Sequence, residues 1–153
     1  MAFLIDKYLP NYHFNEVHTI NINASAEKCF KEAKNLDFAG SFKIKILLKL
    51  RGLPVKDLRL QPFFKNMCFT YLEEDANKEF LIDASTGSIK IFWNFYFKVI
   101  KANRTEVSTE TRILCLTKKA KLLFSVYWFF IKPFSGITRM EMLRLVKKQA
   151  ENK

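Results

Sequence analysis

The fold class of this chain depends on one stretch, which reads Ile89-Lys90-Ile91-Phe92-Trp93-Asn94-Phe95-Tyr96-Phe97-Lys98-Val99-Ile100. Every odd-numbered position in it is apolar, while the even-numbered positions include Lys90, Asn94 and Lys98. An alternation with a period of two residues is typical of a strand that turns one face to the core. The stretch therefore predicts a half-buried antiparallel strand with a large aromatic inner face.

Other strands are predicted around this one, because their apolar residues alternate and polar turns separate them. The first of them is rich in β-branched residues, and the last follows a turn at Asn103-Arg104. The predicted strands are Glu16–Asn23, Asn66–Leu72, Lys78–Ala84, Ile89–Ile100 and Thr105–Leu116. The acidic segment Glu73–Asn77 is interpreted as a solvated hairpin turn and not as a paired-carboxylate site.

Two short helices are predicted between the first and second strands. The segment Ala26–Leu36 follows Ser25, which supplies an N-cap. The segment Phe42–Leu50 has apolar residues at helical spacing, and the Gly- and Pro-containing segment Arg51–Pro54 ends it. Both helices precede the long antiparallel run of strands.

The last third of the chain, Thr117–Asn152, predicts one long helix, or two helices joined at Pro133, which lacks a backbone donor. Between Leu122 and Ile131 this helix is apolar nearly all round, so we expect it to be buried on more than one face. The order of elements predicts an α+β fold, with a curved antiparallel sheet wrapped around the long C-terminal helix and the two short helices closing one end. The space between sheet and helix is a natural cavity.

The charge of the chain is unevenly distributed. Of the net +11, the segment Phe42–Gln61 carries six basic residues against one acidic residue, and Thr117–Lys153 carries nine against two. A localised excess of this kind favours anionic partners or surfaces. The alternative is a solvated helix surface that keeps the protein soluble.

The N-terminal segment, the apolar runs and the cysteines do not indicate secretion or a membrane span. Met1–Pro10 lacks the apolar core of a signal peptide, and the longest apolar run, Leu122–Ile131, is shorter than the roughly 20 residues of a membrane span. We expect a cytoplasmic protein in which Cys29, Cys68 and Cys115 are reduced and mostly buried.

Catalytic and metal-binding motifs do not emerge from the sequence. His13 and His18 have no partners at metal-ligand spacing, so no metal site is expected. No Ser, Cys or Thr lies in a nucleophile pattern, and no Gly-rich loop opens a helix to hold a phosphate. We therefore expect no cofactor and assign no catalytic residue.

The chain resembles the START/Bet v 1-like superfamily, whose members are also known as SRPBCC or helix-grip proteins, and is similar to small uncharacterised bacterial members. The similarity spans nearly the whole chain, although the Gly-rich turn of the family is reduced to Gly87 and about five strands replace seven. The matching residues are Leu9-Pro10, Tyr12, Leu36-Asp37, Leu50-Arg51-Gly52-Leu53-Pro54, Ser108-Thr109-Glu110-Thr111-Arg112, Phe124, Tyr127-Trp128, Ile131-Lys132-Pro133-Phe134-Ser135-Gly136, Arg139, Met142-Leu143-Arg144 and Ala150-Glu151.

The resemblance implies one helix-grip domain over residues 1–153, with a pocket for lipids, acyl chains, isoprenoids, polyketides or similar apolar molecules. The strands and the long helix would line it with facing side chains. An alternative is that the rings fill this space and leave nothing to bind. The candidate lining residues are Phe69, Tyr71, Trp93, Phe95, Phe97, Thr109, Thr111, Ile113, Phe124, Tyr127, Trp128 and Ile131.

Glu110 and Arg112 are the candidate polar anchor. They are two residues apart on a predicted strand, so they share a face. If that face turns inward, Arg112 could hold a ligand carboxylate or phosphate bidentately, with Glu110 orienting it. The alternative is a salt bridge on the outer face of the sheet, worth about 0–1 kcal/mol.

Two functions are favoured by these residues, and a third is disfavoured. The first is a non-enzymatic carrier or sensor of a small apolar ligand, with basic helices that guide contact with anionic membrane surfaces. The second is a cyclase or hydratase that would use an inward acid or base such as Glu110, His18 or Tyr127. Nucleic-acid binding is not expected, because the aromatic residues alternate as an inner face and form no exposed stacking platform.

Overall fold

The computed structural model describes residues 3–50, 52 and 55–152 of the chain. The predicted helix end at Arg51–Pro54 thus lies largely outside the described residues. In chain order the elements are α1 (Leu4–Tyr8), β1 (Phe14–Ile22), α2 (Ala26–Lys34), the 3-10 helix η1 (Phe38–Gly40), α3 (Phe42–Leu50), α4 (Leu60–Asn66), β2 (Thr70–Asp75), β3 (Glu79–Asp83), β4 (Ile89–Lys101), β5 (Arg104–Cys115) and α5 (Lys118–Glu151).

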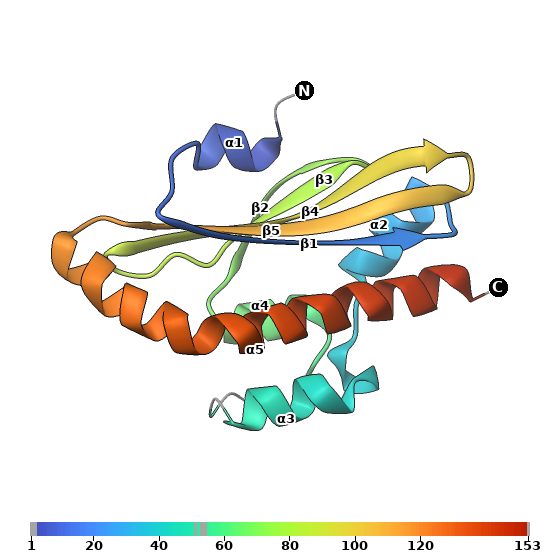
Figure 1. Cartoon of the computed structure of the whole chain (residues 1–153). Coiled ribbons are helices and arrows are strands. Elements are labelled where there is room, and N and C mark those ends of the chain that lie inside the picture. Colours follow the sequence, from blue (N-terminus) through green and yellow to red (C-terminus); the bar gives the residue numbers. More distant parts are fainter. Residues whose placement is uncertain (1–2, 51, 53–54, 153) are drawn as a thin grey trace.

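The strands form one antiparallel, five-stranded sheet in the order β1-β5-β4-β3-β2. The long hairpin of β4 and β5 places Trp93 opposite Thr111 and Phe95 opposite Thr109. Helix α5 runs along one face of this sheet, together with α2, α3 and α4, and α1 lies on the other face (Figure 1). The predicted α+β class and its curved sheet around a long C-terminal helix are confirmed.

The predicted strand Asn66–Leu72 is wrong in its first half. The chain instead forms α4 up to Asn66, and β2 begins only at Thr70 after a left-handed residue, Cys68, with φ of 57°. The spacing of Leu60 and Phe63, both buried, is helical and was the signal for this helix. The helix was missed because its apolar residues lie next to a strand-like run.

The middle of strand β4 is buried on both faces, so the prediction of a half-buried strand is wrong there. Phe92 and Asn94, which point away from α5, are only 8% and 2% exposed. Helix α1 covers that face of the sheet, where Ile5 and Leu9 share an apolar cluster with Phe92. This helix has only five residues, too few for a periodic pattern to predict it.

Helix α5 continues through Pro133 as one helix, and Figure 1 shows its axis changing direction along the way. The composition of its segment Leu122–Ile131 predicted burial on more than one face, and this prediction is wrong. Phe124 is buried, whereas Phe129 and Phe130 are 77% and 67% exposed. The expectation fails because the sheet is a single layer and packs on one side of the helix.

Candidate functional site

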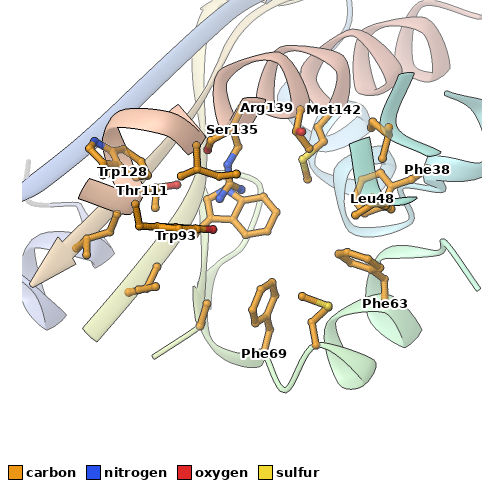
Figure 2. A pocket seen from close by; sticks show the side chains of 18 of the residues that line it. Phe38, Leu48, Phe63, Phe69, Trp93, Thr111, Trp128, Ser135, Arg139 and Met142 are labelled. Carbon is orange, nitrogen blue, oxygen red and sulfur yellow. The ribbon is translucent and has the colours of Figure 1, made fainter. Parts of the chain in front are cut away.

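A cavity of about 210 Å³ lies between the inner face of the sheet, helix α5 and the α3–α4 side of the molecule (Figure 2). It is formed where strands β4 and β5 present alternate side chains toward the helix. Its walls consist of Phe38, Ile44, Leu48, Phe63, Met67, Phe69, Ala84, Ile91, Trp93, Thr111, Ile113, Phe124, Tyr127, Trp128, Ile131, Ser135, Thr138, Arg139 and Met142.

Most of the candidate lining residues meet at this cavity. The structure places eight of the twelve in its walls, drawn from the β-sheet, from the segment before β2 and from α5. These eight are Phe69, Trp93, Thr111, Ile113, Phe124, Tyr127, Trp128 and Ile131.

The other four candidates lie outside the cavity walls. Phe95 and Phe97 pack with Phe80, with ring centroids 5.0 and 6.1 Å from it, and so fill the far part of the space under the sheet. Tyr71 stacks on the same Phe80 ring and is 40% exposed. Thr109 is buried and accepts a hydrogen bond from the Trp93 indole. Rings therefore fill one part of the sheet–helix space and leave the other part open.

Sequence reasoning missed the wall contributed by the short helices. Ile44 and Leu48 of α3 are buried and line the cavity. Their spacing of four residues places both on one face of the helix, a signal that could have included them. Phe38 of η1 and Phe63 of α4 join them, with ring centroids 5.5 Å apart. No pattern in the sequence shows that these segments fold back to the same cavity.

The sequence-based candidate list also lacked Arg139 of α5, the one arginine among the described residues that line the cavity. Its guanidinium carbon lies 3.6 Å from the centre of the Trp93 ring, a cation–π contact at the cavity wall. Figure 2 shows Arg139 reaching from the helix onto the face of Trp93. Stacking engages the face of a guanidinium, whereas its N–H donors lie along its edge. A cationic group is thus built into an otherwise mostly apolar wall.

Glu110 and Arg112 lie on the opposite face of β5, away from the cavity. The Arg112 guanidinium donates to Glu110 at 2.7 Å, to Asp6 at 2.7 Å and to the Leu9 carbonyl at 3.1 Å. Arg112 is buried in this network beneath the N-terminal segment. The pair therefore fastens α1 to the sheet and does not line the cavity.

Charge pairing sets the protonation of this network. Burial alone would lower the pKa of Arg112, but its hydrogen bonds to Glu110 and Asp6 outweigh burial and raise that pKa above its ordinary value. Burial alone would raise the pKa of Asp6, whereas the hydrogen bonds from Arg112 and from the Phe3 N–H hold it below its usual range. Both groups are charged at neutral pH.

A second, shallower cleft lies on the other side of Trp128. It holds Glu16 and His18 of β1, whose Oε1 and Nε2 atoms are 2.8 Å apart, beside Pro133 and Gly136 of α5. Glu16 is 8% exposed, and its Oε2 atom has no hydrogen-bond partner within the described part of the chain. Across residues 3–50, 52 and 55–152, no three His, Cys, Asp or Glu side chains gather as a metal site.

The remaining candidate groups are His13 and the three cysteines, and none of them lines the cavity. His13 accepts the backbone N–H of Cys115 at 3.1 Å through Nδ1. Cys29 and Cys115 are buried and Cys68 is exposed, all three as free thiols. Burial raises the pKa of the Cys29 and Cys115 thiols, which makes them poor nucleophiles.

Comparison with known proteins gives a fold but no activity. No family model matches this chain, and no curated protein matches its sequence. Norcoclaurine synthase of Thalictrum flavum, solved as a point mutant with a transition-state analogue, is 10% identical, covers 90% of this chain and 94% of its own, and has a TM-score of 0.50. A START superfamily protein of Mycobacterium smegmatis is 11% identical and covers 80% of this chain and 94% of its own, with a TM-score of 0.40.

The di-domain ARO/CYC protein BexL from the BE-7585A biosynthetic pathway is also similar, at 12% identity and a TM-score of 0.49. It matches 92% of this chain, which spans only 50% of the length of BexL. At 10% identity and a TM-score of 0.50, the likeness to norcoclaurine synthase shows the fold alone. Separately, no helix among the described residues has the length and hydropathy needed to cross a bilayer.

Proposed function

We propose that this chain, which has the helix-grip fold of START and Bet v 1-like proteins, binds a small amphipathic ligand in the cavity between its sheet and α5. The family resemblance of the sequence is confirmed at the level of fold by the similarity to norcoclaurine synthase. The observation that carries the proposal is the cavity itself. An apolar void costs packing energy, and a bound ligand would recover that energy by filling it.

The cavity walls support a ligand that is mostly apolar and small. Phe, Leu, Ile, Met and Trp side chains form most of the lining, so burial of a hydrocarbon would supply the affinity at roughly 25 cal/mol per Å². The volume of about 210 Å³ is below the 300–1,000 Å³ range common for drug-sized ligands. A short acyl chain or a small isoprenoid has suitable dimensions and polarity.

Arg139 supports an anionic group on that ligand. A guanidinium stacked on Trp93 is held in a fixed orientation, and it pairs well with a carboxylate or phosphate through charge-assisted hydrogen bonds. Thr111, Ser135 and Thr138 add hydroxyl groups to the walls. We therefore infer a ligand with one anionic end and a hydrocarbon body.

Carriage would also involve contact with anionic membranes. The excess positive charge lies in α5 and around α3, and both helices contribute walls of the cavity. Juxtaposed basic side chains are attracted to anionic lipid surfaces.

Ligand binding can be followed by the protein's own fluorescence, since Trp93 and Trp128 are its two tryptophans and both line the cavity. We expect octanoate and 1-octanol to change this fluorescence in a saturable way. Arg139→Met should weaken octanoate binding about tenfold and leave octanol binding nearly unchanged, because it removes the charge but keeps an apolar side chain.

Matched variants make this experiment decisive. Arg144→Met removes another arginine of α5 that is paired with Glu141, so octanoate binding should be retained. Ser135→Phe places a ring in the cavity and should block both ligands. If neither ligand binds, and native mass spectrometry of gently purified protein shows only the unliganded mass, the proposal is wrong.

An enzyme of the cyclase or hydratase kind is less well supported. Glu110 is excluded as its inward acid, since it pairs with Arg112 on the other face of the sheet. Among the described residues of the cavity wall, Tyr127 and Arg139 are the titratable ones, so the wall contains no carboxylate or imidazole. His18 is paired with Glu16 in the second cleft, with Trp128 as the shared wall.

A further inference from the structure

Helix α5 carries an exposed apolar face on the side away from the cavity. Six side chains on it are between 44% and 77% exposed, and apart from the adjacent Phe129 and Phe130 they recur three or four residues apart. We name this surface the outer face of α5; its members are Leu122, Val126, Phe129, Phe130, Phe134 and Ile137.

The two sides of this helix segment differ in what they contact. Phe124, Trp128 and Ile131 point toward the cavity and the sheet. The rings of Phe129 and Phe130, with centroids 5.3 Å apart, point outward and are 77% and 67% exposed. A contiguous exposed patch of large apolar side chains marks an interaction surface, because a protein gains nothing by leaving it in water.

Lysines precede the outer face along α5, and one lies within its span. The segment Thr117–Met140 contains five basic residues and no acidic residue. Lys118, Lys119, Lys121 and Lys132 are exposed, and none of them forms an ion pair with an acidic group in the described part of the chain. An apolar face with cationic flanks has the composition of a helix that lies in a membrane interface.

We propose that the outer face of α5 docks on the surface of an anionic lipid bilayer, with Phe129 and Phe130 entering the boundary between headgroups and acyl chains. The lysines would lie at the level of the anionic headgroups. Charge complementarity favours this occupant over a second copy of the chain. Two outer faces in contact would bring lysines together without an acidic residue from the segment to pair them.

The docking face adjoins the cavity. Tyr127 lines the cavity and is also 46% exposed, so its ring lies between the cavity and the outer face. A ligand with a hydrocarbon body could pass from the bilayer to the cavity along this edge. This transfer step rests on the proposed ligand binding, whereas docking itself does not.

Vesicle flotation tests the docking. With the full chain, we expect binding to phosphatidylcholine vesicles that contain about 30% phosphatidylglycerol, and at least about tenfold weaker binding to pure phosphatidylcholine. Raising the salt concentration should weaken the binding by screening. The variant Phe129→Gln/Phe130→Gln should lose at least about tenfold in affinity, while Lys118→Gln/Lys119→Gln/Lys121→Gln should lose the preference for anionic lipid.

Val99→Gln is the matched control, because Val99 is 63% exposed on another part of the surface and should not affect docking. Ser135→Phe separates this proposal from ligand binding: it should abolish octanoate uptake and leave flotation unchanged. Equal, weak flotation with both vesicle compositions would overturn the docking proposal. So would a wild-type dimer in sedimentation velocity that becomes monomeric in Phe129→Gln/Phe130→Gln, since that would assign the face to a second copy.

Discussion

At the scale of single residues, the missing side chain of Gly136 allows α5 to pack closely against the edge strand β1. A Cβ atom at this position would lie 2.9 Å from Glu16 Oε1 and 3.4 Å from His18 Cε1. The Glu16 carboxylate is buried and bonded to His18, so it cannot move without losing that contact. The glycine therefore allows the helix to pack directly over the Glu16–His18 pair.

Gly136→Ala should consequently destabilise the protein by about 1 kcal/mol. Overpacking costs about 1–3 kcal/mol, and the higher helix propensity of alanine offsets about 1 kcal/mol of it. Urea unfolding measures the difference. In a Glu16→Ala background the same substitution should become stabilising, because the obstructing carboxylate is gone.

Gly40→Ala is the control for this prediction. Its Cβ would meet Leu145 Cδ2 at 3.6 Å, an ordinary contact. A Gly136→Ala protein as stable as wild type would contradict the close packing of α5 on β1.

At the scale of elements, α1 stays on the sheet through polar contacts as well as apolar ones. Asp6 accepts from Arg112, and the buried Glu79 of β3 accepts the Leu4 N–H at 2.7 Å. These contacts also explain the burial of the second face of β4 beneath α1. The helix thus gives a single-layer sheet a partial second cover.

The Asp6 contact predicts a pH-dependent contribution to stability. Because folding lowers the pKa of Asp6 below its ordinary 3.8, the contribution is present above that pH and is lost as pH falls through the folded-state value. Asp6→Asn should lower the free energy of unfolding by about 0.5–1 kcal/mol at pH 7, as for a partly exposed ion pair.

Urea unfolding at pH 7 and at pH 2 checks this linkage. The difference between wild type and Asp6→Asn should shrink as the pH falls, because protonation of the wild-type carboxyl group removes the charge that pairs with Arg112. A difference that stays constant between the two conditions would show that the charge of Asp6 does not matter.

At the scale of the whole molecule, the cavity couples ligand occupancy to stability. The rings of Phe80, Phe95 and Phe97 pack one part of the sheet–helix space, while the part around Trp93 and Thr111 stays open. An open apolar void sacrifices packing energy that a bound ligand would restore.

A ligand at 100 times its dissociation constant should therefore stabilise the protein by about 2.7 kcal/mol. For a chain of this length, that corresponds to a rise in Tm of roughly 5–10 °C. A thermal melt with and without octanoate measures the effect. Ser135→Phe should show little further rise with octanoate, and a rise equal to that of wild type would place the ligand outside the cavity.

Much of the fold could be predicted because period-two alternation is a local property. The alternating residues of β4 and β5, the cap at Ser25 and the helix Phe42–Leu50 each occur in the structure as expected. Eight of the twelve candidate residues also line the cavity, and most of them share one face of a strand or of a helix, where the period of two or of 3.6 residues places them.

Which side chains share a face follows from the local sequence, because it depends only on the geometry of strands and helices. What covers each face depends instead on tertiary contacts. They place Glu110 and Arg112 beneath α1, bring Arg139 over Trp93 and leave Phe129 and Phe130 exposed. These outcomes depend on contacts between segments distant in the chain, and a residue's own neighbours in sequence carry no record of such contacts.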